Sequence, residues 1–356
     1  MPLHIIRNSP RLRLATLLTL ITVATSFSLC AQVPEPQVGI INRDAAVYNQ
    51  ATGKIYILDA THNAVSVISS DNAATSVKVG SGPVSIGANN VTGMVYVVNN
   101  SERSVSVLDG KTDTVVATVP TPARSYAVAV DEVGNKVYIS NIFSNMVTVI
   151  DGATNTATNV PAGGADGVIV DNDRKRVYLL HYEDTIVAEL DPATGAVTKI
   201  PTGALHEWGF LRAGNTLYVG HVQDADVAAI DLETHAIRKL PTGSMPCALA
   251  YDANKAQLYV ASYASGTVTV FDKETVAATI KVPAHPQAVA LDAEKALLYV
   301  ASPQQNAVAV IDLKARRVLR TITTVDRPYA LAINPTTHAV YTANLGNAPF
   351  TLLGKQ

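Results

Sequence analysis

Cysteine is scarce in this chain, and its scarcity excludes a fold held together by disulfide bonds. Only Cys30 and Cys247 occur in 356 residues. Cys30 lies in an N-terminal segment with the pattern of a removable leader, so Cys247 would have no partner within the mature chain. We therefore expect side-chain packing and backbone hydrogen bonds alone to stabilise the fold.

Charged residues are also few, at 16% of the chain, and neither sign dominates. With 27 basic and 29 acidic residues the formal net charge is −2, so no global basic field would attract nucleic acid. No stretch interleaves basic and aromatic residues in the way that is typical of proteins that bind single strands. The composition therefore argues against nucleic acid as a partner. Hydrophobic residues make up 48% of the chain, enough to bury a large core and to exclude disorder as the main state.

The first 31 residues have the pattern of a secretory signal peptide. Three arginines precede an apolar run at residues 14–29, and Ala31 suits cleavage directly after it. The sequence therefore predicts an exported protein, periplasmic in preference to extracellular, with a mature chain of residues 32–356.

Two alternatives to cleavage stay open. A retained transmembrane helix is disfavoured because Thr and Ser interrupt the apolar run and Pro34 and Pro36 follow it. A lipid anchor on Cys30 is disfavoured because Leu29 stands where the bacterial lipoprotein motif has a small residue. With the leader removed we expect a monomer without a transmembrane segment.

The mature chain repeats one pattern eight times. Thirteen residues after a recurring tyrosine, six of the eight repeats have an aspartate, and seven residues before it, seven of the eight have Asp or Asn. These residue types close hairpin turns by bonding their own backbone. The tyrosines recur every 40 to 42 residues, at Tyr56, Tyr96, Tyr138, Tyr178, Tyr218, Tyr259, Tyr299 and Tyr341.

Four short runs surround these positions in each repeat. In the third repeat they are residues 126–130, 137–139, 146–150 and 156–160, which are rich in β-branched residues and separated by turn residues. No window sustains an apolar period of 3.6 residues, so helices are not expected. Four antiparallel strands repeated about every 40 residues are the signature of a β-propeller blade. The sequence therefore predicts an all-β protein made of a single β-propeller.

The number of repeats favours eight blades over the alternative of seven. Eight tyrosine repeats span residues 37–356, and the last one ends at Gln356 just after its third strand. We expect residues 37–41 to supply the missing outer strand. N- and C-terminal strands would then close the ring within one four-stranded blade and leave no open edge.

The repeats resemble those of the YVTN β-propeller family. Residues 96–99, Tyr-Val-Val-Asn, and residues 138–141, Tyr-Ile-Ser-Asn, are similar to the Tyr-Val-Thr-Asn motif that gives the family its name. Together with the leader they make the whole mature chain similar to YncE-like exported proteins. The resemblance implies a propeller but assigns no reaction, because the family's repeat is structural. Related propellers include lactonases and subunits of amine dehydrogenases, and none of their catalytic motifs carries over to this chain.

Candidate functional residues lie where a repeat departs from its own pattern. Residues three after each tyrosine and twelve before it should lie at the face where loops open onto the central channel. Two neighbouring repeats have histidine three after the tyrosine, where the others have Asn, Asp or Ser. We expect the ligand-binding residues at this face to be Tyr126, Asp166, His181, His206, Glu207, His221, Cys247 and Tyr329.

The seam between the fourth and fifth repeats concentrates these departures. His206 should lie opposite His221 across a strand pair, with His181 one blade away. Glu207 and Glu189 are carboxylates at positions that are small or apolar in the other repeats. Imidazole and carboxylate together suit Zn²⁺ or Cu²⁺, or general acid–base catalysis. In the alternative interpretation the histidines cap loops, as the asparagines do elsewhere, and the glutamates pair with neighbouring cations.

Two functions therefore stay open. The regular repeats and the lack of a catalytic sequence motif favour a non-catalytic exported propeller. It would bind a protein, an envelope component or a small polar ligand through its loop face and central channel. The alternative is a periplasmic enzyme, metal-dependent or hydrolytic in the manner of lactonases, that uses the seam between repeats 4 and 5. The sequence identifies no cofactor.

Overall fold

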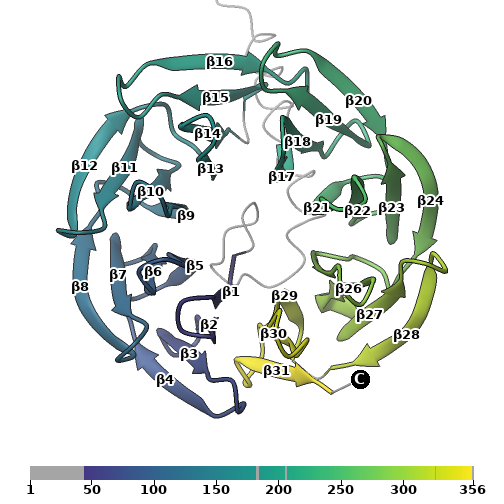
Figure 1. Ribbon diagram of the computed structural model, residues 1–356, viewed down its shortest axis with the longest axis horizontal. Coiled ribbons are helices and arrows are strands. Elements are labelled where there is room, and N and C mark those ends of the chain that lie inside the picture. The colour runs from purple at the N-terminus through teal and green to yellow at the C-terminus, as the bar shows by residue number, and fades with distance from the viewer. Residues whose placement is uncertain (1–43, 182–183, 205–206, 325, 355–356) are drawn as a thin grey trace, which may run out of the picture. The chain divides into compact units, whose positions relative to one another are not determined.

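The computed structural model describes residues 44–354, except 182–183, 205–206 and 325. Within this part of the chain, eight antiparallel sheets stand in a ring around a central axis (Figure 1). Seven of the sheets have four strands, and three strands of the eighth are described. The structure therefore confirms an all-β propeller of eight blades in place of seven.

The first four blades contain strands β1 to β16. They are β1 (Ala46–Asn49), β2 (Lys54–Asp59), β3 (Ala64–Ile68), β4 (Ala74–Lys78), β5 (Pro83–Ala88), β6 (Met94–Asn99), β7 (Ser104–Asp109), β8 (Thr114–Pro120), β9 (Ser125–Asp131), β10 (Lys136–Asn141), β11 (Met146–Asp151), β12 (Thr156–Pro161), β13 (Gly167–Asp171), β14 (Arg176–Leu180), β15 (Ile186–Leu190) and β16 (Val197–Pro201).

The last four blades contain strands β17 to β31 and one short 3-10 helix. They are β17 (Glu207–Ala213), β18 (Thr216–His221), β19 (Asp226–Asp231), β20 (Ile237–Pro241), β21 (Pro246–Asp252), β22 (Gln257–Ser262), β23 (Thr267–Asp272), β24 (Thr275–Lys281), β25 (Ala288–Asp292), β26 (Leu297–Ser302), η1 (Pro303–Gln305), β27 (Ala307–Asp312), β28 (Arg317–Thr323), β29 (Pro328–Ile333), β30 (Val340–Asn344) and β31 (Phe350–Leu353).

Within each blade the strands follow one another from the axis outward (Figure 1). The innermost strand of each blade contacts the innermost strands of both neighbouring blades, and β29 of the last blade contacts β1 of the first. These contacts close the ring. The outer strand that we expect at residues 37–41 lies outside the described residues.

The hydrophobic core is divided among the seams between blades. One cluster joins Tyr96 and Val107 of blade 2 to Val128 and Ile139 of blade 3. The two middle strands of blade 2, β6 and β7, are buried along almost their whole length, whereas the outermost strand β8 is mostly exposed. A single blade therefore cannot bury its own faces, and each depends on its neighbours for a core.

Some of the recurring tyrosines make a hydrogen bond across the seam between two blades. Tyr56 is fully buried, and its hydroxyl donates a hydrogen bond to the carbonyl of Gly110 in blade 2 at 3.2 Å. The carboxylate of Asp113 lies at the same distance from this hydroxyl. Tyr341 repeats the contact between the last blade and the first, where its hydroxyl donates to the side chain of Asn72. The same residue type thus links blades within the ring and at its closure.

Asparagine and aspartate seven residues before the tyrosine close hairpin turns, as the sequence predicts. The side-chain oxygen of Asn89 accepts two backbone N–H groups of its own turn, at 2.9 and 3.0 Å. Its amide nitrogen also donates to the side chain of Asn135 in the next blade at 3.0 Å. The equivalent Asp171 of blade 4 pairs with the Arg212 guanidinium of blade 5 at 2.9 Å. The turn residues therefore join neighbouring blades at the face opposite the loops.

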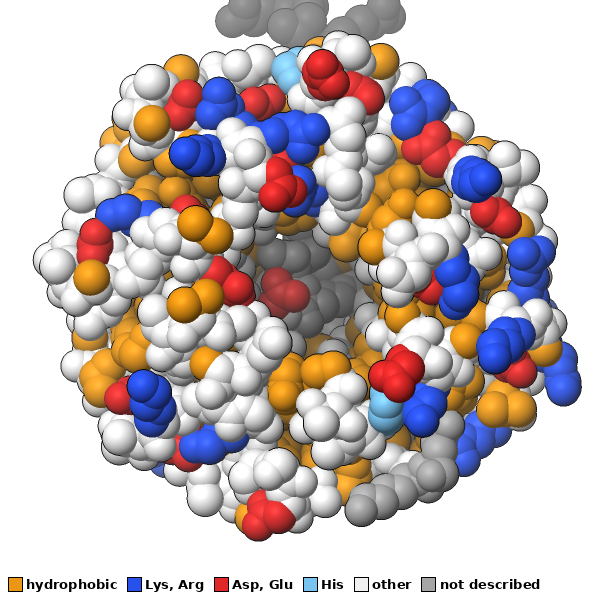
Figure 2. Space-filling model, in the orientation of Figure 1, with side chains coloured by type: hydrophobic (Ala, Val, Ile, Leu, Met, Phe, Trp, Pro, Cys, Tyr) orange, Lys and Arg blue, Asp and Glu red, His pale blue; other side chains and the backbone are white. Residues whose placement is uncertain are grey.

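Charges of both signs are mixed on the surface of the ring. Figure 2 shows one face, where lysine and arginine side chains are interspersed with aspartate and glutamate around the rim. No field of one sign covers this face, in agreement with the balanced composition. Among the described residues no helix is long and apolar enough to span a membrane.

Removal of the tyrosine hydroxyl tests its role between blades. Tyr56→Phe should lower the free energy of unfolding by about 1 kcal/mol for each hydrogen bond that the Gly110 carbonyl and Asp113 lose. Tyr178 is the matched control, because it is equally buried and its hydroxyl has no partner among the described residues. Tyr178→Phe should leave the urea unfolding midpoint unchanged or raise it. Equal losses in the two variants would contradict a linking role.

Candidate functional site

Asparagine stands at the end of the second strand, at the loop face, in three of the eight blades. In blade 3, the side-chain oxygen of Asn141 accepts from the Ser125 hydroxyl at 2.6 Å. Its amide nitrogen donates to the Met146 carbonyl at 3.1 Å and to the Thr148 hydroxyl at 3.0 Å. One side chain thus joins the first, second and third strands. In blades 4 and 5, a histidine stands in place of this asparagine.

His221 occupies the equivalent position in blade 5 and is fully buried. Its Nδ1 lies 2.6 Å from Oδ1 of Asp226, the first residue of β19. Lys239 of β20 lies 3.4 Å from the Asp226 carboxylate and 3.1 Å from the Asp224 carboxylate. With Nδ1–H donated to a carboxylate, a neutral imidazole keeps its lone pair on Nε2, and this atom has no partner among the described residues. His221 therefore caps its loop on one side and has an unused nitrogen on the other.

The cluster around His221 contains ligand atoms that suit a divalent cation. Atoms of His221, Asp224 and Asp226 lie within 4.8 Å of one another. The Lys239 ammonium already lies against both carboxylates. A metal ion would therefore compete with this lysine, which already neutralises part of the charge of the two carboxylates.

His181 occupies the equivalent position in blade 4, directly after β14, and is 8% exposed. Its ring lies against Gly163 in the connector from blade 3: a Cβ on Gly163 would come within 2.6 Å of Cε1. Gly163 has a φ of +87°, so glycine is required both by its backbone and by the approach of the ring. Burial is the main cause that lowers the pKa of His181, and a backbone hydrogen bond at Gly164 opposes it. The imidazole is therefore neutral at neutral pH, and its Nε2 has no partner among the described residues.

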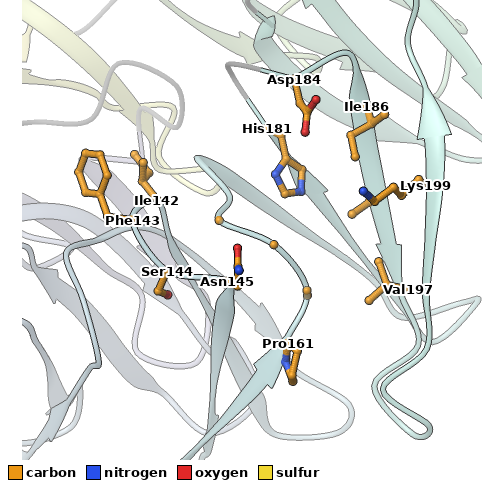
Figure 3. A pocket seen from close by; sticks show the side chains of 14 residues that line it. Ile142, Phe143, Ser144, Asn145, Pro161, His181, Asp184, Ile186, Val197 and Lys199 are labelled. Carbon is orange, nitrogen blue, oxygen red and sulfur yellow. The ribbon is translucent and has the colours of Figure 1, made fainter.

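A pocket of about 650 Å³ lies beside His181, between blades 3 and 4. Ile142 and Phe143 of blade 3 lie on one side of it, and the side chains of blade 4 lie on the other (Figure 3). Phe143 is 72% exposed, which is unusual for an aromatic ring. Among the described residues, neither Asp184 nor Lys199 has an ion-pair partner. The pocket is lined by residues 142–145, residues 161–164, His181, Asp184, Ile186, Ala188, Val197 and Lys199.

The structure separates two residues that the sequence grouped. We expected His181 and His221 to border one seam, between blades 4 and 5. His181 instead contacts the connector from blade 3 and borders the seam between blades 3 and 4. His206 lies outside the described residues. The backbone of Glu207, one residue later, pairs with His221. The turn between β17 and β18 is shorter than its equivalent in blade 3, since Ala213 pairs with Thr216 whereas Asp131 pairs with Lys136, and the bulge between Glu207 and Phe210 offsets only part of this shift.

The remaining predicted site residues lie on or beside the innermost strands, around the channel (Figure 1). Cys247 is buried, and its thiol donates to the Pro286 carbonyl at 3.2 Å. Tyr329 is buried as well, and burial raises the pKa of its hydroxyl. Tyr126 and Asp166 are partly buried, and the Asp166 N–H donates to the Leu180 carbonyl at 2.8 Å.

Glu189 pairs with neighbouring basic side chains, as expected if the glutamates of the seam are structural and do not bind a ligand. Its carboxylate lies 3.1 Å from the Arg176 guanidinium and 3.2 Å from Nε2 of His235 in blade 5. It stands in the middle of β15, opposite Tyr178, and not at the loop face. Glu189 therefore contributes to the seam and not to the pocket.

Sequence reasoning missed the partners of the histidines. Asp226 stands where the other repeats have Ala, Ser, Met, Ile, Thr or Pro, eight residues after the tyrosine. This departure was as visible as the histidines themselves. Lys199 and Asp184 were missed because charged residues on loops and outer strands are usually solvated, and only the structure shows that they border one pocket.

Comparisons with known proteins agree on the fold. The family described as "Lactonase, 7-bladed beta-propeller" matches residues 176–318, less than half of the chain. No curated protein matches. Hydrazine synthase from Kuenenia stuttgartiensis is similar in structure, with a TM-score of 0.63 at 16% identity over 77% of this chain and 96% of that chain. Dihydro-heme d1 dehydrogenase NirN in complex with DHE has a TM-score of 0.71 at 13% identity, over 82% and 69%. At these identities the likeness shows a β-propeller fold alone.

The lowered pKa of His181 predicts a pH dependence of stability. The unfolded chain takes up a proton at this histidine near pH 6.5, and the folded chain does so only at lower pH. This contribution to stability is therefore present above about pH 6.5 and is lost as the pH falls below it. Unfolding of the wild type and of His181→Asn in urea, from pH 7.5 to pH 5, should show a loss in the wild type that the variant lacks. A constant difference between the two over this range would contradict a buried, neutral His181.

Proposed function

We propose that this protein is an exported, non-catalytic β-propeller that binds a small ligand at its loop face, in the pocket between blades 3 and 4. The observation that carries the proposal is His181, a buried imidazole at the wall of a pocket of about 650 Å³ whose Nε2 has no partner among the described residues. Pockets of this size are typical of small-molecule sites. An unpaired buried polar atom costs free energy, which a ligand with a matching group would recover.

The walls of the pocket favour a ligand with both polar and apolar parts. Ile142, Phe143 and Val197 offer apolar surface, while Asp184 and Lys199 offer charges of opposite sign. The exposed ring of Phe143 gives a ligand an aromatic surface to pack against. A protein partner or an envelope component could present the same groups, and the experiment below distinguishes a small molecule from these.

Export is part of the proposal and rests on the sequence. The basic leader, the apolar run at residues 14–29 and Ala31 support secretion of the chain from residue 32, to a periplasm in preference to the medium. The tyrosine-centred repeats support a place among YncE-like propellers of the YVTN type. We propose that the mature protein acts as a monomer, because the ring already closes through contacts between β29 and β1.

Blocking the pocket tests the proposed function. Val197 lines the pocket and is 37% exposed; Ile237, the equivalent residue on the outer strand of blade 5, is 38% exposed. Val197→Trp should fill the pocket, and Ile237→Trp should add the same bulk elsewhere. We expect the wild type and Ile237→Trp to retain the same compound from a small-molecule extract, as detected by mass spectrometry of the washed protein. We expect Val197→Trp to lose at least about 90% of it. Retention of the same compound by all three proteins would refute binding in this pocket.

A hydrolytic activity is the second candidate, and a specific observation favours it. Asp226 holds Nδ1 of His221 at 2.6 Å and leaves Nε2 unpartnered, an arrangement that suits a general base. The residues matched by the lactonase family, 176–318, include both side chains.

Lactone hydrolysis measured in a pH-stat separates the second candidate from the first. With five- and six-membered lactones as substrates, a general base at this position predicts that His221→Asn lowers the rate by about 100-fold or more. Asparagine already fills the equivalent position in blades 2, 3 and 8, so the variant should fold. His62→Asn, at a histidine whose side chain is 58% exposed, is the control and should keep the wild-type rate. A rate that is the same in all three proteins excludes His221 as the base.

A further inference from the structure

Blades 4 and 5 carry the same three polar residues at the same spacing. His181, Asp184 and Lys199 in blade 4 correspond to His221, Asp224 and Lys239 in blade 5, each 40 residues later. The strand registers match as well: Ala188 lies opposite Lys199 in blade 4, and Ala228 lies opposite Lys239 in blade 5. The two triplets therefore hold equivalent places in their blades.

One residue separates the two arrangements. Asp226 of blade 5 corresponds to Ile186 of blade 4. In blade 5, the Asp226 carboxylate accepts from His221 at 2.6 Å and lies 3.4 Å from Lys239, so it joins the imidazole to the ammonium. In blade 4, Ile186 provides no such group and lines the pocket.

In blade 5 the Asp226 carboxylate therefore joins the imidazole to the ammonium, whereas in blade 4 no group among the described residues joins them. Nε2 of His181 has no partner among the described residues, and Lys199 has no ion pair there. The pocket lies beside both side chains (Figure 3). What blade 4 lacks, relative to blade 5, is one carboxylate between an imidazole and an ammonium.

We infer that the pocket between blades 3 and 4 binds the carboxylate of an amphipathic organic acid, which takes the place that Asp226 occupies in blade 5. The inference rests on the proposed function and names its ligand class. The ligand carboxylate bridges Lys199 and His181, and its apolar part packs against Ile142, Phe143 and Val197. Apolar burial supplies affinity, and the bridged carboxylate supplies specificity.

The Asp184 carboxylate also lines the pocket, and it is compatible with a bound carboxylate. Asp184 corresponds to Asp224, and in blade 5 two carboxylates share the single ammonium of Lys239 at 3.1 and 3.4 Å. The blade 3 loop at residues 142–145 and the connector at residues 161–164 carry no titratable side chain toward His181. Asp166, two residues beyond the connector, is the next carboxylate along the chain. Among the described residues, the charged groups around the pocket therefore match those of blade 5 apart from the missing carboxylate.

Binding should be coupled to protonation of His181. A backbone hydrogen bond at Gly164 acts on the pKa of His181, and Nε2 has no partner among the described residues, so we expect the neutral ring to offer a lone pair at Nε2. A carboxylate needs a donor, so His181 gains a proton when the acid binds. Affinity should rise as the pH falls from 8 to 6, by up to about tenfold per pH unit.

Two probes of the same shape test the inference directly. Protein labelled at isoleucine δ1 methyl groups reports on the pocket through Ile142 and Ile186 in NMR spectra. We expect 3-phenylpropionate to shift these signals at pH 6 with an affinity at least about tenfold higher than that of 3-phenylpropionamide. His181→Asn should remove the pH dependence of binding.

An internal mimic tests the geometry without any ligand. Ile186→Asp places a carboxylate where blade 5 has Asp226. It should raise the pKa of His181 in an NMR titration and abolish binding of 3-phenylpropionate. Ile186→Asn, of the same shape but uncharged, is the matched control and should not raise this pKa.

The outcomes distinguish a wrong ligand class from a pocket that binds no ligand. If the amide binds as tightly as the acid, the carboxylate assignment is wrong and the pocket remains a ligand site. The probes are added at 10 mM, which is about 100 times a Kd of 0.1 mM. If neither probe moves the signals of Ile142 at this concentration, both the ligand class and the proposed function are wrong. An unchanged pKa of His181 in Ile186→Asp would overturn the equivalence of the two blades.

Discussion

The fold depends on one constraint: no blade can bury its own two faces. The middle strands of each blade are buried on both sides, and the residues that cover them belong to the neighbouring blades. Stability therefore comes from the seams, where Tyr56 reaches Gly110 and Tyr341 reaches Asn72 across the junction of last and first blades. Each blade shares one seam with each of its two neighbours, so both faces of every blade are covered only when the ring is closed.

Because contacts at the seams stabilise the ring, the residues at the loop face can vary. Turn residues such as Asn89 and Asp171 join blades at the opposite face. At the loop face, Asn141 shows that the structural need is only a side chain that fastens three strand ends. His181 and His221 replace such a residue, and each has one ring nitrogen without a partner among the residues that the structure describes. The chemistry of the protein is thus concentrated where two repeats depart from a pattern that the other blades keep.

The fold could be predicted from the sequence because its cause is periodic. The tyrosine spacing and the Asp or Asn at fixed offsets determine strands, turns and the number of blades without knowledge of any single contact. The site could be predicted only in part. The histidines were recognisable as departures from the repeat, but the seam that each one borders depends on how the connector at Gly163 lies against the ring of His181. The turn between β17 and β18 is shorter than its equivalent in blade 3, so Glu207, in place of the expected His206, pairs with His221 even though β17 also has a bulge. Local packing determines where a bulge forms and how a connector runs, and the spacing of residues in the sequence does not reveal this packing.

The central claim is that the pocket beside His181 is a binding site and not an incidental gap between blades. A crystal structure of the protein, produced from the full chain and purified without exchange of small molecules, tests it most directly. The account predicts density for a bound molecule in the pocket, with a carboxylate between His181 and Lys199. A pocket that holds only water, with Lys199 paired to Asp184, would contradict the account.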